Sequence, residues 1–230
     1  MVAASRAVVV ILLLSLAACG GKPPPAAPAA DPRAAQDLAT YRQLVGANSL
    51  EFAVTVGREI QRKYPGTPAA AEVAASLPEV EAKYKAGVDA KRLAALWDYQ
   101  TGVQSGGAQS SASIFSTEPA GAAQVRFIFR RHAEWGRSAY LYAGGGGFAC
   151  PEPCSLLLRF DDAAATRWKA HLPETGEPAI FIDDDAALAA KLPGTRRLAI
   201  EATLRDQGPV TLLFEPGGFE PGRWVELPSK

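Results

Sequence analysis

The spacing of hydrophobic positions along the chain changes near residue 96. Before it, apolar residues recur about every four positions, as at Phe52, Val56 and Ile60, which predicts helices. After it, apolar and polar residues alternate, as in segments 125–130 and 197–204, which predicts β-strands. The pattern therefore predicts an α+β fold, with an N-terminal helical hairpin followed by an antiparallel β-sandwich-like domain.

Turn and cap residues divide the helical part. Tyr64-Pro65-Gly66 ends one helix, and Thr67-Pro68 begins the next as N-cap and first helical residue. The segment 76–79, Ser-Leu-Pro-Glu, fits a capping box and predicts the start of a further helix. Residues 58–74, REIQRKYPGTPAAAEVA, resemble the tetratricopeptide-like repeats of outer-membrane lipoproteins, including one in the β-barrel assembly machinery. The resemblance implies a short packed helical segment of about one and a half repeats.

The strand-rich part is divided by clusters of Gly, Pro and Asp. Besides the two alternating segments, an alternation begins at Trp97 and Tyr99. Further strands are predicted at 138–143, 154–160, 179–183 and 209–215. One helix is predicted at 183–194, where three aspartates suit the positive end of the helix dipole.

The N-terminus has the features of a secretory signal. Arg6 precedes an apolar run over residues 7–18 that ends in small side chains, and this run is too short to span a bilayer. Leu16-Ala17-Ala18-Cys19 resembles the lipobox of bacterial lipoproteins, which implies lipid attachment at Cys19. Because Gly20 follows instead of Asp, the resemblance implies an anchor in the outer membrane of a Gram-negative bacterium, with the protein facing the periplasm.

These observations predict four segments in chain order. The Pro- and Ala-rich stretch after the signal has little to bury and predicts an extended spacer. The predicted segments are 1–18 signal peptide, 19–36 spacer, 37–95 helical segment and 96–230 antiparallel β-domain.

The charge composition of the chain bears on whether nucleic acid is a partner. The chain carries 24 Lys and Arg against 24 Asp and Glu, and one of the basic residues, Arg6, lies in the signal. Without a basic excess, no overall field favours nucleic acid, so a nucleic-acid partner is excluded from the prediction. The Gly run at 144–147 lacks the Gly-Lys-Ser/Thr of a phosphate-binding loop and predicts a turn, and no cofactor motif is found.

Cys150 and Cys154 flank a Pro-Glu-Pro turn. In a hairpin with a three-residue loop, their Cα atoms would lie about 4.5–5.5 Å apart, which a disulfide tolerates. Export and the use of Cys19 by lipid leave these two to pair, so we expect a structural disulfide. The alternatives are a zinc site completed by His132 and His171, whose spacings match no familiar motif, and a redox pair. No metal site is predicted.

The segment 130–137, RRHAEWGR, is the main candidate for binding. Its members are Arg130, Arg131, His132, Trp135 and Arg137. Cations beside an aromatic ring suit an anionic or sugar-bearing partner, such as lipopolysaccharide, peptidoglycan or an envelope protein. The alternative is a solvated hairpin turn.

Short motifs of the β-rich part resemble uncharacterised exported domains of Gram-negative bacteria and, more loosely, the periplasmic accessory protein of type VI secretion. They are Trp-x-Tyr at 97–99, Gly-Phe-x-Cys at 147–150, Arg-Phe-Asp at 159–161 and Gly-Phe at 218–219. No Gly-x-Ser-x-Gly is present, and the adjacent Asp161 and Asp162 point to opposite faces of a strand. We therefore expect a non-enzymatic envelope lipoprotein. The alternatives are an accessory subunit of an envelope or secretion assembly, and a hydrolase with an unrecognised site.

Overall fold

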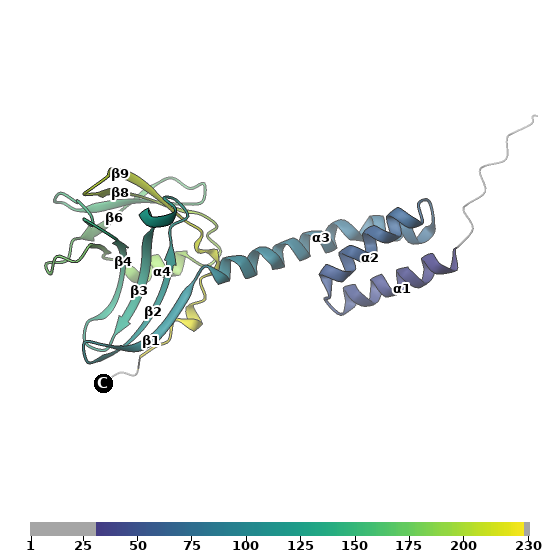
Figure 1. The fold of residues 1–230 in the computed structure, drawn as a ribbon, viewed down its shortest axis with the longest axis horizontal. Coiled ribbons are helices and arrows are strands. Elements are labelled where there is room, and N and C mark those ends of the chain that lie inside the picture. Colours follow the sequence, from purple (N-terminus) through teal and green to yellow (C-terminus); the bar gives the residue numbers. More distant parts are fainter. Residues whose placement is uncertain (1–30, 228–230) are drawn as a thin grey trace, which may run out of the picture. The chain divides into compact units, whose positions relative to one another are not determined.

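The computed structural model describes residues 31–227, so Cys19 and the whole signal segment lie outside the described residues. Within this range it contains four α-helices and nine β-strands, which confirms the α+β class (Figure 1). The helices are α1 (Pro32–Gly46), α2 (Leu50–Lys63), α3 (Pro68–Ala95) and α4 (Asp185–Lys191). The strands are β1 (Asp98–Gln104), β2 (Gly107–Phe115), β3 (Val125–His132), β4 (Gly136–Ala143), β5 (Ser155–Phe160), β6 (Thr166–His171), β7 (Ala179–Ile182), β8 (Leu198–Leu204) and β9 (Gly208–Phe214).

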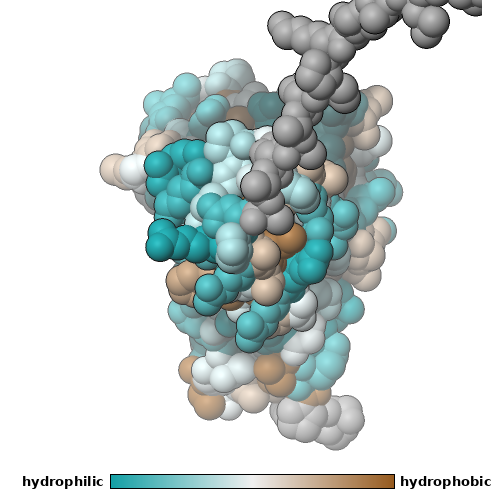
Figure 2. Space-filling model, turned by 90° about the vertical axis from the view of Figure 1, so that its right-hand side faces the viewer, coloured by the Kyte–Doolittle hydropathy of each residue, from teal (hydrophilic) through white to brown (hydrophobic). Residues whose placement is uncertain are grey.

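The chain divides into two compact units, the helical unit (Met1–Pro78) and the β-unit (Glu79–Lys230), and each is described by itself. Helix α3 contributes to both, while the change from helix to strand lies between Ala95 and Asp98. None of the helices within residues 31–227 has the length and hydropathy needed to cross a membrane. In the view of Figure 2, apolar residues lie as separate spots on a mainly hydrophilic surface.

The helical unit packs small side chains against larger ones. Helix α1 begins inside the predicted spacer because Asp31 caps it, accepting a hydrogen bond from the Arg33 amide at 2.8 Å. Gly57 of α2 lets the two neighbouring helices approach, since a Cβ at this position would lie 2.9 Å from Leu77 and 3.1 Å from Tyr41. The buried face of α2 is Ala53, Val54, Gly57 and Ile60, whereas Phe52 is exposed. A strict four-residue stripe drifts around a helix of 3.6 residues per turn, so the predicted stripe is only partly buried.

The predicted helix start at residues 76–79 is wrong, because α3 continues through this segment with Pro78 in its interior. Ser76 does not act as a cap. Its hydroxyl bonds the Glu72 carbonyl at 3.2 Å and meets the Tyr41 hydroxyl at 2.9 Å. Burial of Val73 and Leu77 stabilises the helical conformation here, against the roughly 3 kcal/mol that an interior proline costs.

The strands of the β-unit form one continuous antiparallel sheet in the order β1-β2-β3-β4-β7-β6-β5-β8-β9. Strand β6 pairs with β7 through Ala170 and His171 and with β5 through the rest of its length, so it connects the two halves. In Figure 1 strands β2–β4 curve strongly. The halves share one core, in which the rings of Phe127 on β3 and Phe214 on β9 lie 5.5 Å apart. The sheet therefore closes on itself in a sandwich-like manner.

The sequence prediction missed strands β2 and β6. Strand β2 reads GAQSSASIF, and its polar residues Ser110, Ser111 and Ser113 are buried, so hydropathy gave no alternation. Strand β6 reads TRWKAH, and its only buried residue is Ala170. Both strands form because their backbone groups pair with neighbours on each side, which no local pattern reports.

Candidate functional site

The alternation of strand β3 divides the predicted binding segment between two faces of the sheet. Arg130 lies opposite Ser138 of β4, and Arg131 lies opposite Arg137. Neighbouring residues of a strand point to opposite faces, so Arg130 belongs to the outer face and Arg131 to the side of the core. The structure therefore brings Arg130, His132 and Trp135 together and separates them from the other two arginines.

Arg131 and Arg137 hold the C-terminal segment of the chain. The Arg131 guanidinium lies 3.9 Å from the centroid of the Trp224 ring and donates to the Trp224 carbonyl at 2.9 Å. It also forms an ion pair with Glu226 at 2.6 Å. Arg137 lies 5.2 Å from the same ring and pairs with Asp185 at 2.9 Å. Both cations have carboxylate partners, and their contacts indicate a structural role.

His132 is buried and positions Trp135. Its Nδ1 accepts from the amides of Glu134 at 3.2 Å and Trp135 at 3.3 Å, which leaves Nε2 to donate to the Gln104 carbonyl at 2.9 Å. This arrangement describes a neutral imidazole with the proton on Nε2. The Trp135 ring stacks on the imidazole, with the ring centroids 3.7 Å apart and an angle of 13° between the ring planes. The turn between β3 and β4 therefore presents Trp135, which is 48% exposed, in a defined orientation.

Arg130 is half-buried between aromatic rings and forms no ion pair among the described residues. Its guanidinium carbon lies 5.0 Å from the Trp135 centroid and 5.2 Å from the Tyr140 centroid. With the other residues of the range 31–227 it forms neither an ion pair nor a side-chain hydrogen bond, and its Nε is buried. Burial raises the pKa of the Tyr140 hydroxyl, which is therefore neutral at physiological pH. The Tyr140 ring continues the surface to Phe181, with centroids 4.8 Å apart.

Arg126 extends the same surface toward the far end of β2. Its guanidinium lies 5.7 Å from the Phe115 centroid. Unlike Arg130, Arg126 has hydrogen-bonding and ionic partners. Its guanidinium nitrogens donate to the Ser113 hydroxyl at 3.0 and 2.8 Å, and it forms an ion pair with Asp98 at 3.3 Å. We call this outer surface the Arg–aromatic face. Its members are Phe115, Arg126, Arg130, Trp135, Tyr140, Tyr142 and Phe181.

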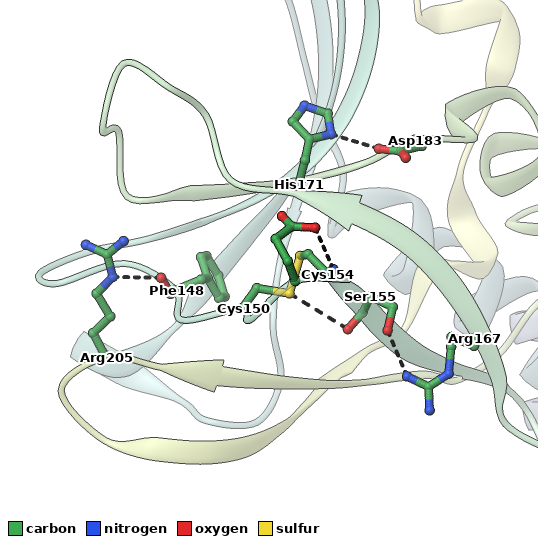
Figure 3. The surroundings of a disulfide bond; sticks show 9 residues. Phe148, Cys150, Cys154, Ser155, Arg167, His171, Asp183 and Arg205 are labelled. Carbon is green, nitrogen blue, oxygen red and sulfur yellow. Dashed lines mark hydrogen bonds and ion pairs between the residues drawn. A yellow bond between two sulfur atoms is a disulfide. The ribbon is translucent and has the colours of Figure 1, made fainter.

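The structure links Cys150 and Cys154, as predicted, with Cα atoms 5.2 Å apart (Figure 3). The predicted hairpin is wrong, because β5 begins only at Ser155 and Cys150 belongs to no strand. The Cys154 amide donates to the Glu152 carboxylate at 3.3 Å. Both sulfurs are in the disulfide, so the zinc alternative lacks two of its four ligands.

Two arginines from other parts of the β-unit donate hydrogen bonds to residues next to the disulfide. Arg205, just after β8, donates to the Phe148 carbonyl at 2.8 Å, and Arg167 of β6 donates to the Ser155 hydroxyl at 2.8 Å (Figure 3). A cavity of about 350 Å³ lies beside it, lined among others by Cys150, Arg167 and Glu201. Its opposite charges give it no preference for an anion over a cation.

His171 forms the one carboxylate–imidazole contact among the described residues, with Nδ1 2.7 Å from Asp183 (Figure 3). A hydrolytic site would also need a nucleophile on the other ring nitrogen. Within residues 31–227, Nε2 of His171 makes no hydrogen bond to a serine, threonine or cysteine. Nor does any group of three His, Cys, Asp or Glu side chains in the described range come together to hold a metal ion.

Comparisons with known proteins add little to this geometry. No family model matches the chain, and no curated protein matches it. Among solved structures, the chain is similar to invasion associated protein B from Bartonella henselae, with 18% identity and a TM-score of 0.38. The match covers 55% of this chain and 87% of that one. At this TM-score the likeness carries no inference about function.

Proposed function

We propose that this chain is a non-enzymatic lipoprotein of the bacterial envelope, anchored in the outer membrane through Cys19, whose Arg–aromatic face binds another envelope component. The lipobox motif at residues 16–19 supports the anchor. The binding role rests on one observation: the half-buried Arg130 guanidinium lies between two aromatic rings without a carboxylate partner among the described residues.

The composition of the face supports a binding role. Arginine, tryptophan and tyrosine are enriched among the residues that contribute most of the energy at protein interfaces, because they combine a large contact area with hydrogen-bonding groups. Trp135 is 48% exposed, Phe115 52% and Tyr142 43%, so these rings lie open to a partner. Stacking on the buried His132 restricts Trp135 before binding, which lowers the entropy lost on association.

We expect Cys19→Ala to abolish labelling by radioactive palmitate and to leave the precursor unprocessed by the lipoprotein signal peptidase. The physical reason is that alanine has no sulfur to which the lipid can be joined. The double variant Cys150→Ser/Cys154→Ser is the control, because it removes the other two cysteines and should keep the label. Labelling that survives Cys19→Ala contradicts the anchor.

We expect a photoreactive amino acid at position 135 to crosslink a partner in living cells. The matched control is position 103 on β1, where Val103 is 76% exposed but lies in the register of the opposite face. A partner captured at position 135 and absent at position 103 supports the Arg–aromatic face. Equal capture at both positions, or capture at 103 alone, excludes it as the binding surface. A set of proteins captured in fixed proportions identifies an assembly as the partner.

A further inference from the structure

The sheet around Arg130 contains several buried polar atoms that have no hydrogen-bond partner in residues 31–227. They are Gln109 Oε1 on β2, Arg130 Nε on β3 and Ser138 Oγ on β4. Arg130 lies directly opposite both Ser111 and Ser138, and Gln109 lies two residues from Ser111, on the same face. Directly opposite side chains have Cβ atoms about 4.5–5.5 Å apart, so these groups lie together on the outer face of three adjacent strands.

Such a cluster is unusual in a native fold. Nearly all buried polar side-chain atoms have a hydrogen-bond partner, because burial removes them from water without compensation. The cluster contains a donor in Arg130, an acceptor in Gln109 and a hydroxyl in Ser138 that can do both. A matching ligand therefore carries both an oxyanion and hydrogen-bond donors.

The charged side chains around the cluster indicate that its ligand carries a single negative charge at this place. Arg126 is paired with Asp98, and His132 is neutral, which leaves Arg130 as the cation at this place that forms no ion pair within the described range. Glu177 is close enough for Arg130 to lower its pKa, but the hydrogen bond from the Thr175 hydroxyl is the larger cause of that lowering. One cation suits one carboxylate, whereas a group with several phosphates needs several cations.

The rings beside Arg130 define the rest of the ligand. Trp135 and Tyr140 present aromatic surface next to the hydrogen-bonding floor. A sugar ring has an apolar C–H face and a polar rim, so it fits a surface that combines rings with hydroxyl and amide groups.

We infer that Arg130, Ser138 and Gln109, with Trp135 and Tyr140 as side walls, form a binding site for an amino sugar that carries a carboxylate on its attached peptide, the chemistry of peptidoglycan strands. The terminal nitrogens of Arg130 bind the carboxylate, and the exposed Trp135 ring contacts the C–H face of the sugar. The Ser138 and Gln109 atoms are buried, so they bind amide or hydroxyl groups of the sugar only after the Arg130 side chain has moved aside to meet the carboxylate. This inference rests on the proposed function, since it specifies the ligand of the Arg–aromatic face.

The test is a titration of the purified full-length mature lipoprotein in detergent micelles with three soluble probes. A disaccharide muropeptide carries both sugar rings and carboxylates, an N-acetylglucosamine tetramer carries the rings alone, and tetraglutamate carries carboxylates alone. We expect the muropeptide to bind at least about tenfold more tightly than either of the others. Equal binding of the neutral tetramer, equal or tighter binding of tetraglutamate, or no muropeptide binding overturns the inference.

Two single substitutions test whether the muropeptide binds at Arg130. Arg130→Gln should weaken muropeptide binding about tenfold or more, because a neutral amide replaces the charge-assisted contact. Arg159→Gln, which removes an exposed arginine from β5, is the matched control and should bind as the parent does. If Arg130→Gln does not fold, as judged by its melting transition, the exposed Trp135→Ala variant replaces it with the same expectation. Binding unchanged in the folded variant contradicts the site.

The experiments distinguish a wrong ligand from a face that binds nothing. If crosslinking from position 135 captures a protein and the muropeptide does not bind, the ligand is wrong while the Arg–aromatic face is still a binding surface. If neither experiment finds a partner, the binding role of the face fails together with the ligand.

Discussion

Gly218→Ala is expected to lower the free energy of unfolding of the β-unit by about 3 kcal/mol or more. Gly218 lies directly against the backbone of the last turn of α3, and a Cβ there would meet the backbone of Leu93 and Ala94 far inside the 3.0 Å limit of real Cβ contacts. The contacted atoms are backbone, so no side-chain rotation relieves the overlap. The segment must move away from the helix, which also disturbs Phe219 and Trp97, whose rings lie 4.8 Å apart in the core.

The measurement is equilibrium denaturation by urea, followed by tryptophan fluorescence. Gly222→Ala is the matched control, four residues further along, because a Cβ at this position has nothing within 4 Å. The control should change the free energy of unfolding by less than about 0.5 kcal/mol. Similar values for the two variants contradict the close approach of residue 218 to α3.

Phe129→Ala is expected to cost about 3–5 kcal/mol of stability in the β-unit. The Phe129 side chain is fully buried, and its ring centroid lies 4.8 Å from Phe127, 5.6 Å from Phe219, 5.8 Å from Trp224 and 6.3 Å from Trp97. Its loss leaves a cavity between strand β3 and the C-terminal segment. The rigid rings around it cannot collapse to fill that space, so both the transfer and the cavity penalties apply.

Phe115→Ala provides the comparison for this variant. Phe115 ends the neighbouring strand β2, but its side chain is 52% exposed, so its removal should cost less than about 1 kcal/mol. Thermal unfolding of both variants checks the difference. A melting temperature that falls equally in the two contradicts the assignment of Phe129 to the core.

Local patterns were sufficient where structure depends on neighbours in sequence. The turn at Tyr64–Gly66 does separate α2 from α3, because Pro and Gly act on the backbone next to them. Alternation in residues 125–130 and 197–204 does mark β3 and β8, because both strands have one face in a common core. The spacing of the two cysteines also predicted their disulfide, since so short a separation limits the distance between them.

The candidate site was predicted only in part, because its members come from strands that are far apart in sequence. The segment at 130–137 includes Arg130 and Trp135, but Tyr140 and Phe181 join them only through the register of β3, β4 and β7. Ser138 and Gln109 carry no local signal at all. Their significance depends on which atoms lack partners after the sheet has formed.

The sequence by itself determined the order of helical and strand-rich parts, the pairing of Cys150 with Cys154 and the lipobox prediction at Cys19, since each depends on residues a few positions apart. Only the tertiary structure decided which of two adjacent arginines forms no ion pair with the rest of the described chain. Arg130 and Arg131 are adjacent and chemically identical, yet Trp224 and Glu226, more than ninety residues away, bind the second and leave the first on the outer face. Burial and ion pairing depend on distant partners, and a strand that alternates its side chains assigns neighbouring residues to different environments.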